Sequence, residues 1–150
     1  MVRHLLVPID GSELSDAAVS AALALAKPCG ARVSFFHVQP SYYGRPDVAI
    51  YGEGLVLDPA LSEQFTQANA RFATTILDRA LDQARAQGVE ASSETCVSPL
   101  VHEAILEAAE RLGCDLIAMA YKQGLLLKNV SHVDVRDEPF DVMERGDFDV

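Results

Sequence analysis

The sequence has no tryptophan, only three cysteines and no apolar run of the roughly 18 residues that a membrane-spanning helix needs. The cysteines, Cys29, Cys96 and Cys114, are odd in number, and their spacings match no metal pattern. We therefore expect reduced, mostly buried thiols and no metal site. No basic-then-apolar leader precedes the first strand, so a cytoplasmic protein without membrane association is expected.

Basic residues are scarce: 12 Lys and Arg stand against 22 Asp and Glu, a formal net charge of −10. This balance repels phosphate backbones and anionic lipid surfaces, which argues against nucleic-acid and membrane partners. The chain has 150 residues, of which 49% are hydrophobic. That is enough to bury one core with a sheet and two layers of helices.

The first apolar run, residues 4–9, ends in Asp10-Gly11-Ser12 and predicts a buried strand that turns directly into a helix. Ligands bind at the carboxyl ends of parallel strands, where a following helix offers free N–H groups. Asp10 is therefore placed to contact a ligand. The alternative is that Asp10 and Ser12 only shape the turn and cap the helix, and this stretch alone favours that simpler interpretation.

Hydrophobic periodicity predicts strands and helices that alternate along the chain. The expected strands are 4–9, 32–38, 89–97 and 115–120, and the expected helices are 13–27, 59–87 and 99–112. This alternation predicts a doubly wound α/β fold, with a mostly parallel sheet in the order 3-2-1-4(-5) and helices on both faces. The switch point of such a sheet lies beside Asp10.

Residues 39–58 break the periodicity with several prolines and glycines, and they include Tyr42, Tyr43 and Tyr51. A loop of this length is either functional, as a lid or partner surface, or a mobile insertion whose tyrosines shield the end of the sheet.

Three segments resemble the universal stress protein family, whose fold belongs to the adenine-nucleotide-binding α/β group. They are Leu6-Val7-Pro8-Ile9-Asp10-Gly11-Ser12, Phe36-His37-Val38 and the run from Ala108 to Met119. Together they cover about residues 3 to 120 in the right order and spacing. The resemblance implies that Asp10 and Val38 hold adenine and ribose. The full set of nucleotide-contact positions that it implies is Pro8, Asp10, Val38, Met119, Gly124 and Val130.

The sequence departs from the family after Ala120. Nucleotide-binding members wrap the phosphates in a Gly-x-x-Gly loop followed by Gly-Ser or Gly-Thr, because glycine lets backbone N–H groups approach phosphate oxygens. Here Gly124 is the one loop glycine, and Lys128-Asn129 stands where Gly-Ser belongs. The Lys128 charge suits a phosphate, but its side chain blocks the close backbone approach. ATP or AMP binding is therefore expected to be weak or lost.

The last 17 residues, 134–150, contain seven acidic and two basic side chains, so they hold −5 of the net charge. We divide the chain into an α/β domain, 1–133, and this acidic tail. Family members end in a fifth strand that pairs across a dimer, and Phe140, Val142 and Met143 are its possible remnant. The tail is thus a poorly ordered extension, a rearranged partner-binding arm, or the product of a reading-frame change.

Two functions compete at this point. The first is a non-catalytic stress-response binding or regulatory protein, acting as a homodimer with an unidentified protein partner and a degraded nucleotide pocket. The alternative is an ATP or AMP sensor that uses Asp10, Val38 and an improvised loop of Gly124, Lys128 and Ser131. Catalysis is the least supported class, because the phosphate segment has no conventional hydroxyl and the four histidines are scattered, so no catalytic residue is expected.

Overall fold

The computed structural model describes residues 2–41, 59–121 and 124–130. In this part of the chain, five strands form one sheet in the order β3-β2-β1-β4-β5, and every neighbouring pair is parallel except β4 and β5. The strands are β1 (His4–Pro8), β2 (Arg32–Gln39), β3 (Ala91–Val97), β4 (Leu116–Tyr121) and β5 (Gly124–Asn129). The predicted strand order and mostly parallel sheet are confirmed.

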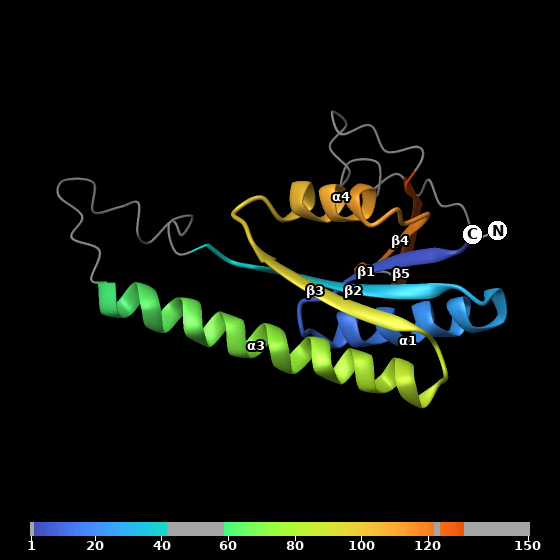
Figure 1. The fold of residues 1–150 in the computed structure, drawn as a ribbon, viewed down its shortest axis with the longest axis horizontal. Helices are drawn as coiled ribbons and strands as arrows, with labels where there is room; N and C mark the ends of the chain where they lie inside the picture. Colours follow the sequence, from blue (N-terminus) through green and yellow to red (C-terminus); the bar gives the residue numbers. More distant parts are fainter. Residues whose placement is uncertain (1, 42–58, 122–123, 131–150) are drawn as a thin grey trace.

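Helices cover both faces of the sheet, as expected (Figure 1). On one face α1 (Glu13–Cys29) packs on β1 and β4, and α3 (Pro59–Ala86) packs on β2 and β3. The other face carries the short helix α4 (Val101–Arg111). No helix in the described ranges is long and apolar enough to span a membrane.

The central strand β1 supplies side chains to two separate cores. Leu5 and Val7 point to the face of α1 and α3, whereas Leu6 points to the face of α4. All three are fully buried. Successive side chains of a strand alternate between faces, so a strand covered on both sides is apolar throughout. This explains why residues 4–9 form the clearest apolar run near the start of the chain.

The helix ends differ from the expectation at two places. Helix α1 begins after Ser12, whose hydroxyl accepts a bond from the Ser15 N–H, and ends at Gly30 in the left-handed conformation, with Pro28 inside its last turn. The third helix was expected to begin at residue 99. Helix α4 begins only at Val101, and the Ser98 hydroxyl before it accepts from the Leu100 N–H at 3.0 Å.

The segment in which a degraded phosphate loop was expected contains strand β5. Residues 124–129 pair with β4 along their whole length, from Gly124 opposite Tyr121 to Asn129 opposite Leu116. Leu126 is buried, and the leucines on either side of it pack against the core that α1 and α3 share. The fifth strand therefore follows β4 directly. The suggested remnant at Phe140, Val142 and Met143 lies outside the described residues, as do the 42–58 segment and the acidic tail.

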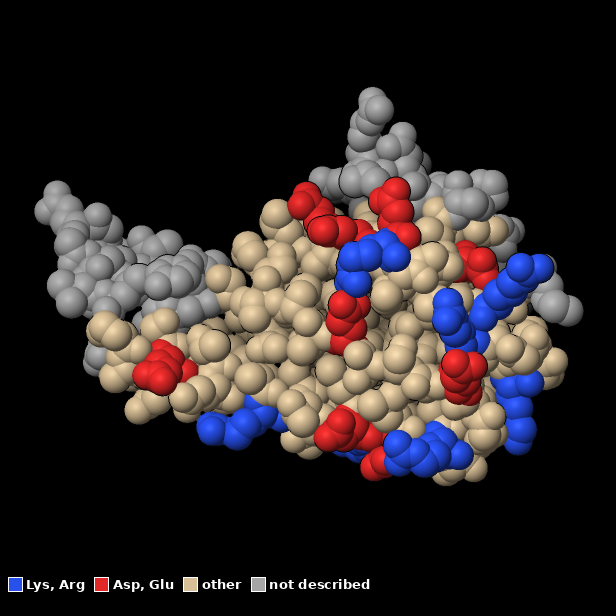
Figure 2. Space-filling view, in the orientation of Figure 1, with Lys and Arg blue, Asp and Glu red and all other residues tan. Residues whose placement is uncertain are grey.

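Charged side chains of both signs are interspersed on the surface (Figure 2). The described part of the face in that view carries no continuous basic patch. Three ion pairs are among the contacts of the described residues, and all of them are at least partly exposed: Arg79–Asp16, Arg85–Asp82 and Arg111–Glu94. Such pairs stabilise a fold only slightly.

Replacing Gly11 by alanine should lower the free energy of unfolding by about 1–3 kcal/mol. Gly11 has a φ of +84°, and a Cβ there would lie 2.6 Å from Phe72 Cζ and 3.1 Å from Ile76 Cγ2. Urea unfolding followed by circular dichroism measures the loss. The control is Gly88→Ala, where φ is +71° but no atom lies within 4 Å of the added carbon. Equal losses in the two variants would show that Phe72 imposes no constraint on the turn.

Asp115 ties the start of β1 to the start of β4. Its Oδ2 accepts from the Arg3 N–H at 2.6 Å and from the His4 N–H at 3.0 Å. These bonds hold the pKa of Asp115 below its ordinary value, and the bond from the Arg3 N–H has the largest effect. A depressed folded-state pKa means that the stabilisation is complete above the unfolded-state value of about 3.9 and is lost as the pH falls through the folded-state value.

The Asp115→Ala variant should therefore be less stable than the original chain by about 1 kcal/mol at pH 7, and the difference should shrink below about pH 4. Urea unfolding at a series of pH values measures both effects. Asp82→Ala is the control, because Asp82 makes an exposed pair within one helix. A difference at pH 7 that persists unchanged in strong acid would contradict this account.

Candidate functional site

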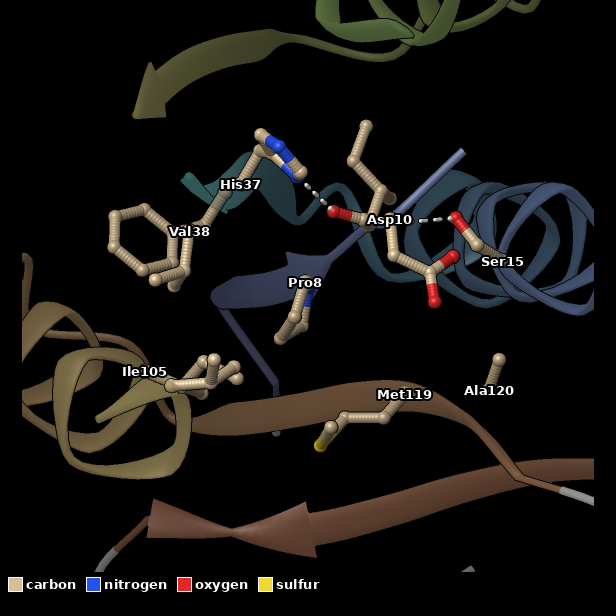
Figure 3. Close-up of a pocket in the computed structure, with 11 residues that line it drawn as sticks. Pro8, Asp10, Ser15, His37, Val38, Ile105, Met119 and Ala120 are labelled. Atoms are coloured by element: carbon tan, nitrogen blue, oxygen red, sulfur yellow. Dashed lines mark hydrogen bonds between the residues drawn. The ribbon is translucent and has the colours of Figure 1, made fainter. Parts of the chain in front are cut away.

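A pocket of about 320 Å³ opens at the carboxyl ends of β1, β2 and β4, where the sheet order reverses direction (Figure 3). Its wall on the remaining side comes from the first turns of α4. The lining residues are Pro8, Ile9, Asp10, Ser15, Phe36, His37, Val38, Val101, Ile105, Met119 and Ala120. Most of these side chains are apolar, which is typical of sites for small organic ligands.

Three hydrogen bonds order the turn after β1, and two of them involve Asp10. The Asp10 N–H donates to Ser15 Oγ at 3.2 Å, the Ser12 N–H donates to Asp10 Oδ1 at 2.9 Å, and the Ser15 N–H donates to Ser12 Oγ at 3.1 Å. The structural role considered for Asp10 and Ser12 is thus present. Asp10 is also exposed in the pocket lining, and a carboxylate can accept several further bonds. The two interpretations of Asp10 are compatible.

His37 extends the contact between β1 and β2 beyond the last residue of β1. Its Nδ1 donates to the Ile9 carbonyl at 2.7 Å, and the Ile9 N–H donates to the Phe36 carbonyl at 2.8 Å. The ring is buried and meets the edge of Phe72 with 5.8 Å between centroids. These contacts fix the peptide group immediately before Asp10 and therefore restrict the direction of the Asp10 side chain (Figure 3).

Four of the six expected nucleotide-contact residues come together in this pocket: Pro8, Asp10, Val38 and Met119. Gly124 and Val130 are not among its lining residues. Gly124 begins β5 opposite Tyr121, and the Val130 N–H donates to the Asp115 carbonyl at 2.9 Å, at the other end of β4. The antiparallel direction of β5 thus leaves Gly124 at the same end of the sheet as the pocket, one position along β4 from the lining residue Ala120, and carries Val130 to the opposite end.

The improvised phosphate loop is also not assembled as expected. Lys128 lies opposite Ile117, in the half of β4 that is remote from the pocket, and it is not a lining residue. Ser131 lies outside the described residues. Among the lining residues of the described chain, Asp10 carries the one formal charge at neutral pH and no Lys or Arg is present.

Sequence reasoning missed several lining residues. Val101 and Ile105 belong to a helical apolar stripe that was assigned to the core, and His37 was treated as a scattered histidine. The feature of the sequence that could have identified His37 is its position near the end of a buried strand, between Phe36 and Val38. Nothing in the local pattern of Ser15 marked it as a residue that lines a pocket. In the described part of the chain, no group of three His, Cys, Asp or Glu side chains is arranged to hold a metal ion.

The sheet order and the pocket at its switch point define a doubly wound α/β protein with a candidate ligand site. The chain belongs to the universal stress protein family, because the model of that family matches residues 1–143. The universal stress protein YxiE of Bacillus subtilis (strain 168) is 31% identical over 140 residues, which are 88% of this chain and 90% of that protein. The resemblance seen in the sequence is confirmed.

Solved structures agree with this assignment. A universal stress protein family member from Burkholderia pseudomallei is similar with a TM-score of 0.60 and 27% identity, over 81% of this chain and 83% of that one. A family protein from Arabidopsis thaliana, solved with AMP bound, is similar with a TM-score of 0.56 and 15% identity, over 79% and 76% of the two chains. At that identity the Arabidopsis structure supports the fold alone.

Replacing His37 by phenylalanine should cost about 1–3 kcal/mol of stability, because the Ile9 carbonyl loses a buried donor while a ring still faces Phe72. Amide hydrogen exchange in Asp10–Ser12 should become faster. In the control variant, His37→Asn, the side-chain amide retains a donor near the position of Nδ1, and exchange in the turn should change less. A phenylalanine variant with unchanged exchange would contradict the role given to this hydrogen bond.

Proposed function

We propose that this chain is a non-catalytic binding protein of the stress response, with a pocket that accepts the nucleoside part of an adenine nucleotide and gives its phosphates little support. The observation that carries the proposal is the contrast between the two halves of the site. The positions that the family resemblance assigns to adenine and ribose line one pocket, whereas the segment expected to wrap phosphates is a strand.

The pocket has the chemistry that a nucleoside needs. Val38, Ile105 and Met119 are apolar side chains from three different elements, and together they can cover the faces of a flat base. The Asp10 carboxylate can accept hydrogen bonds from ribose hydroxyls. Its Oδ1 is already oriented by the Ser12 N–H, so little ordering of Asp10 is needed on binding. A family protein from Arabidopsis thaliana was solved with AMP bound, so an adenine nucleotide is a ligand found in this family.

Phosphate groups meet a less favourable environment. The described lining contains a carboxylate and no Lys or Arg, so added negative charge is repelled rather than neutralised. In β5, backbone groups form hydrogen bonds with β4 and are not gathered into an anion-binding concavity. Phosphoryl transfer requires positioned cationic charge and a group that orients the nucleophile. The described lining offers neither, which supports a binding role over an enzymatic one.

The alternative is an ATP or AMP sensor whose affinity depends on phosphate. The exposed Asp10 and the pocket beside it are compatible with both functions. The two differ in one measurable quantity, the gain in affinity from adenosine to ATP. Dimerisation and a protein partner, which the family resemblance implies, stay predictions.

Isothermal titration with adenosine, AMP and ATP, the last with and without Mg²⁺, tests the proposal. We expect adenosine to bind at least as tightly as ATP, and Asp10→Ala to weaken adenosine binding by about tenfold, the equivalent of about 1.4 kcal/mol. The control is Asp16→Ala, which removes a carboxylate that pairs with Arg79 and does not line the pocket.

Two outcomes would overturn the proposal. ATP binding about tenfold tighter than adenosine, in the protein as purified, would identify the phosphate-dependent sensor instead. Failure of all three ligands to bind would remove the nucleoside altogether and leave a family fold with a different ligand in this pocket.

A further inference from the structure

A row of three polar side chains crosses the sheet at the end opposite to the nucleoside pocket. His4 begins β1, Ser34 lies in β2 and Ser92 lies in β3, with Ser34 and Ser92 directly opposite each other. His4 Nε2 is 2.6 Å from Ser34 Oγ, and Ser34 Oγ is 3.2 Å from Ser92 Oγ. The row borders a second cavity, of about 230 Å³, lined by His4, Arg32, Val33, Ser34, Glu90, Ala91, Ser92 and Leu112.

The row occupies positions where the rest of the same face is apolar. Further along the strands, Leu6 and Phe36 continue this face, and α4 covers them. Helix α4 ends at Arg111 and leaves the row beside the cavity. His4 is 6% exposed and Ser34 is 3% exposed, so two of the three polar side chains are buried, while Ser92 is exposed. A buried polar row is costly compared with apolar packing, and its open end at a cavity indicates a polar ligand.

The charges and hydrogen-bonding groups of the lining limit which ligand chemistry fits. Burial and the charge of Arg32 lower the pKa of His4, so the ring is neutral at pH 7 and has one donor and one acceptor nitrogen. Nε2 bonds with the Ser34 hydroxyl, while Nδ1 is buried with no hydrogen-bond partner among the described residues.

Ser34 Oγ lies within hydrogen-bond distance of both His4 Nε2 and Ser92 Oγ. A serine oxygen has two acceptor lone pairs, so the exposed Ser92 Oγ can accept a further hydrogen bond from a ligand in the cavity. The Glu90 carboxylate is a second acceptor of the lining, and the Arg32 guanidinium supplies a positive charge with several donors.

We propose that this cavity binds a small zwitterion of the free α-amino acid class, with its ammonium group toward Ser92 and Glu90 and its carboxylate toward Arg32. A simple anion fits less well, because the Glu90 carboxylate repels it. A simple amine leaves Arg32 without a counter-charge. The site lies at the amino ends of the strands, apart from the pocket of Asp10, so it does not depend on the function proposed for that pocket.

Nuclear magnetic resonance on the ¹⁵N-labelled full chain tests the proposal. Titration with L-alanine should shift the amide signals of Arg32 and Ser92 in a saturable way, at about millimolar concentrations. Ethylamine and propionate carry the two charged groups of alanine separately, and each should cause much smaller shifts.

Ser92→Ala should weaken alanine binding by about fivefold or more. Its control is Ser93→Ala, one residue further along the same strand, where the side chain points to the opposite face and affinity should not change. Glu90→Gln should weaken binding as well, and it removes the ammonium's partner without touching the hydrogen-bonded row.

Three results would overturn the proposal. They are the absence of saturable shifts with alanine, propionate binding equal to that of alanine, and equal effects of the Ser92 and Ser93 substitutions. Each contradicts a separate step: the presence of a site, the zwitterionic ligand, and the part played by Ser92.

Discussion

The structure depends on the parallel pairing of β1 with β2 on one side and β4 on the other. Both faces of β1 are covered and both of its edges are hydrogen-bonded, so the position of its last residue is tightly determined. The bonds of Ile9 to Phe36 and His37 carry this order one step beyond the strand. Asp10 therefore emerges at the switch point in a defined orientation, although its own side chain is exposed.

The two halves of the candidate nucleotide site rest on different parts of the chain. The nucleoside half is built from β1, β2, β4 and α4, each of which belongs to a packed core. The phosphate half would have to come from the segment that follows β4. In that segment, three consecutive leucines favour burial against the sheet, and each buried leucine contributes about 1.5–3 kcal/mol. A strand there is compatible with the pocket at the switch point, because no residue of β5 is among the described lining residues.

The opposite ends of the sheet have different chemistry for a geometric reason. At the carboxyl ends, α4 and the turn after β1 enclose apolar side chains around a single carboxylate. At the amino ends, α4 has already terminated, and the uncovered face carries hydroxyl, imidazole and charged groups. One short helix on a longer sheet thus produces one apolar and one polar cavity on the same face. Both cavities form without a break in the alternation of buried side chains along the strands.

Much of this protein could be predicted from local pattern. Strands and helices followed from apolar periodicity, the strand order followed from their alternation, and Asp10 and Val38 followed from family motifs at strand ends. Strand β5 did not, because a six-residue apolar segment has the same pattern in a loop as in a strand until a partner edge is known. Its pairing with β4 places Lys128 and Val130 toward the end of the sheet remote from the pocket.

The sequence by itself determined which segments would be strands and helices, since alternation and helical spacing are properties of neighbouring residues. Only the tertiary structure decided which side chains meet. His37 reaches a carbonyl 28 positions earlier in the chain, and the distance from Ser34 to Ser92 spans 58 positions. Such contacts depend on strand register and on where a covering helix ends, and a shift of one residue would turn each side chain to the other face.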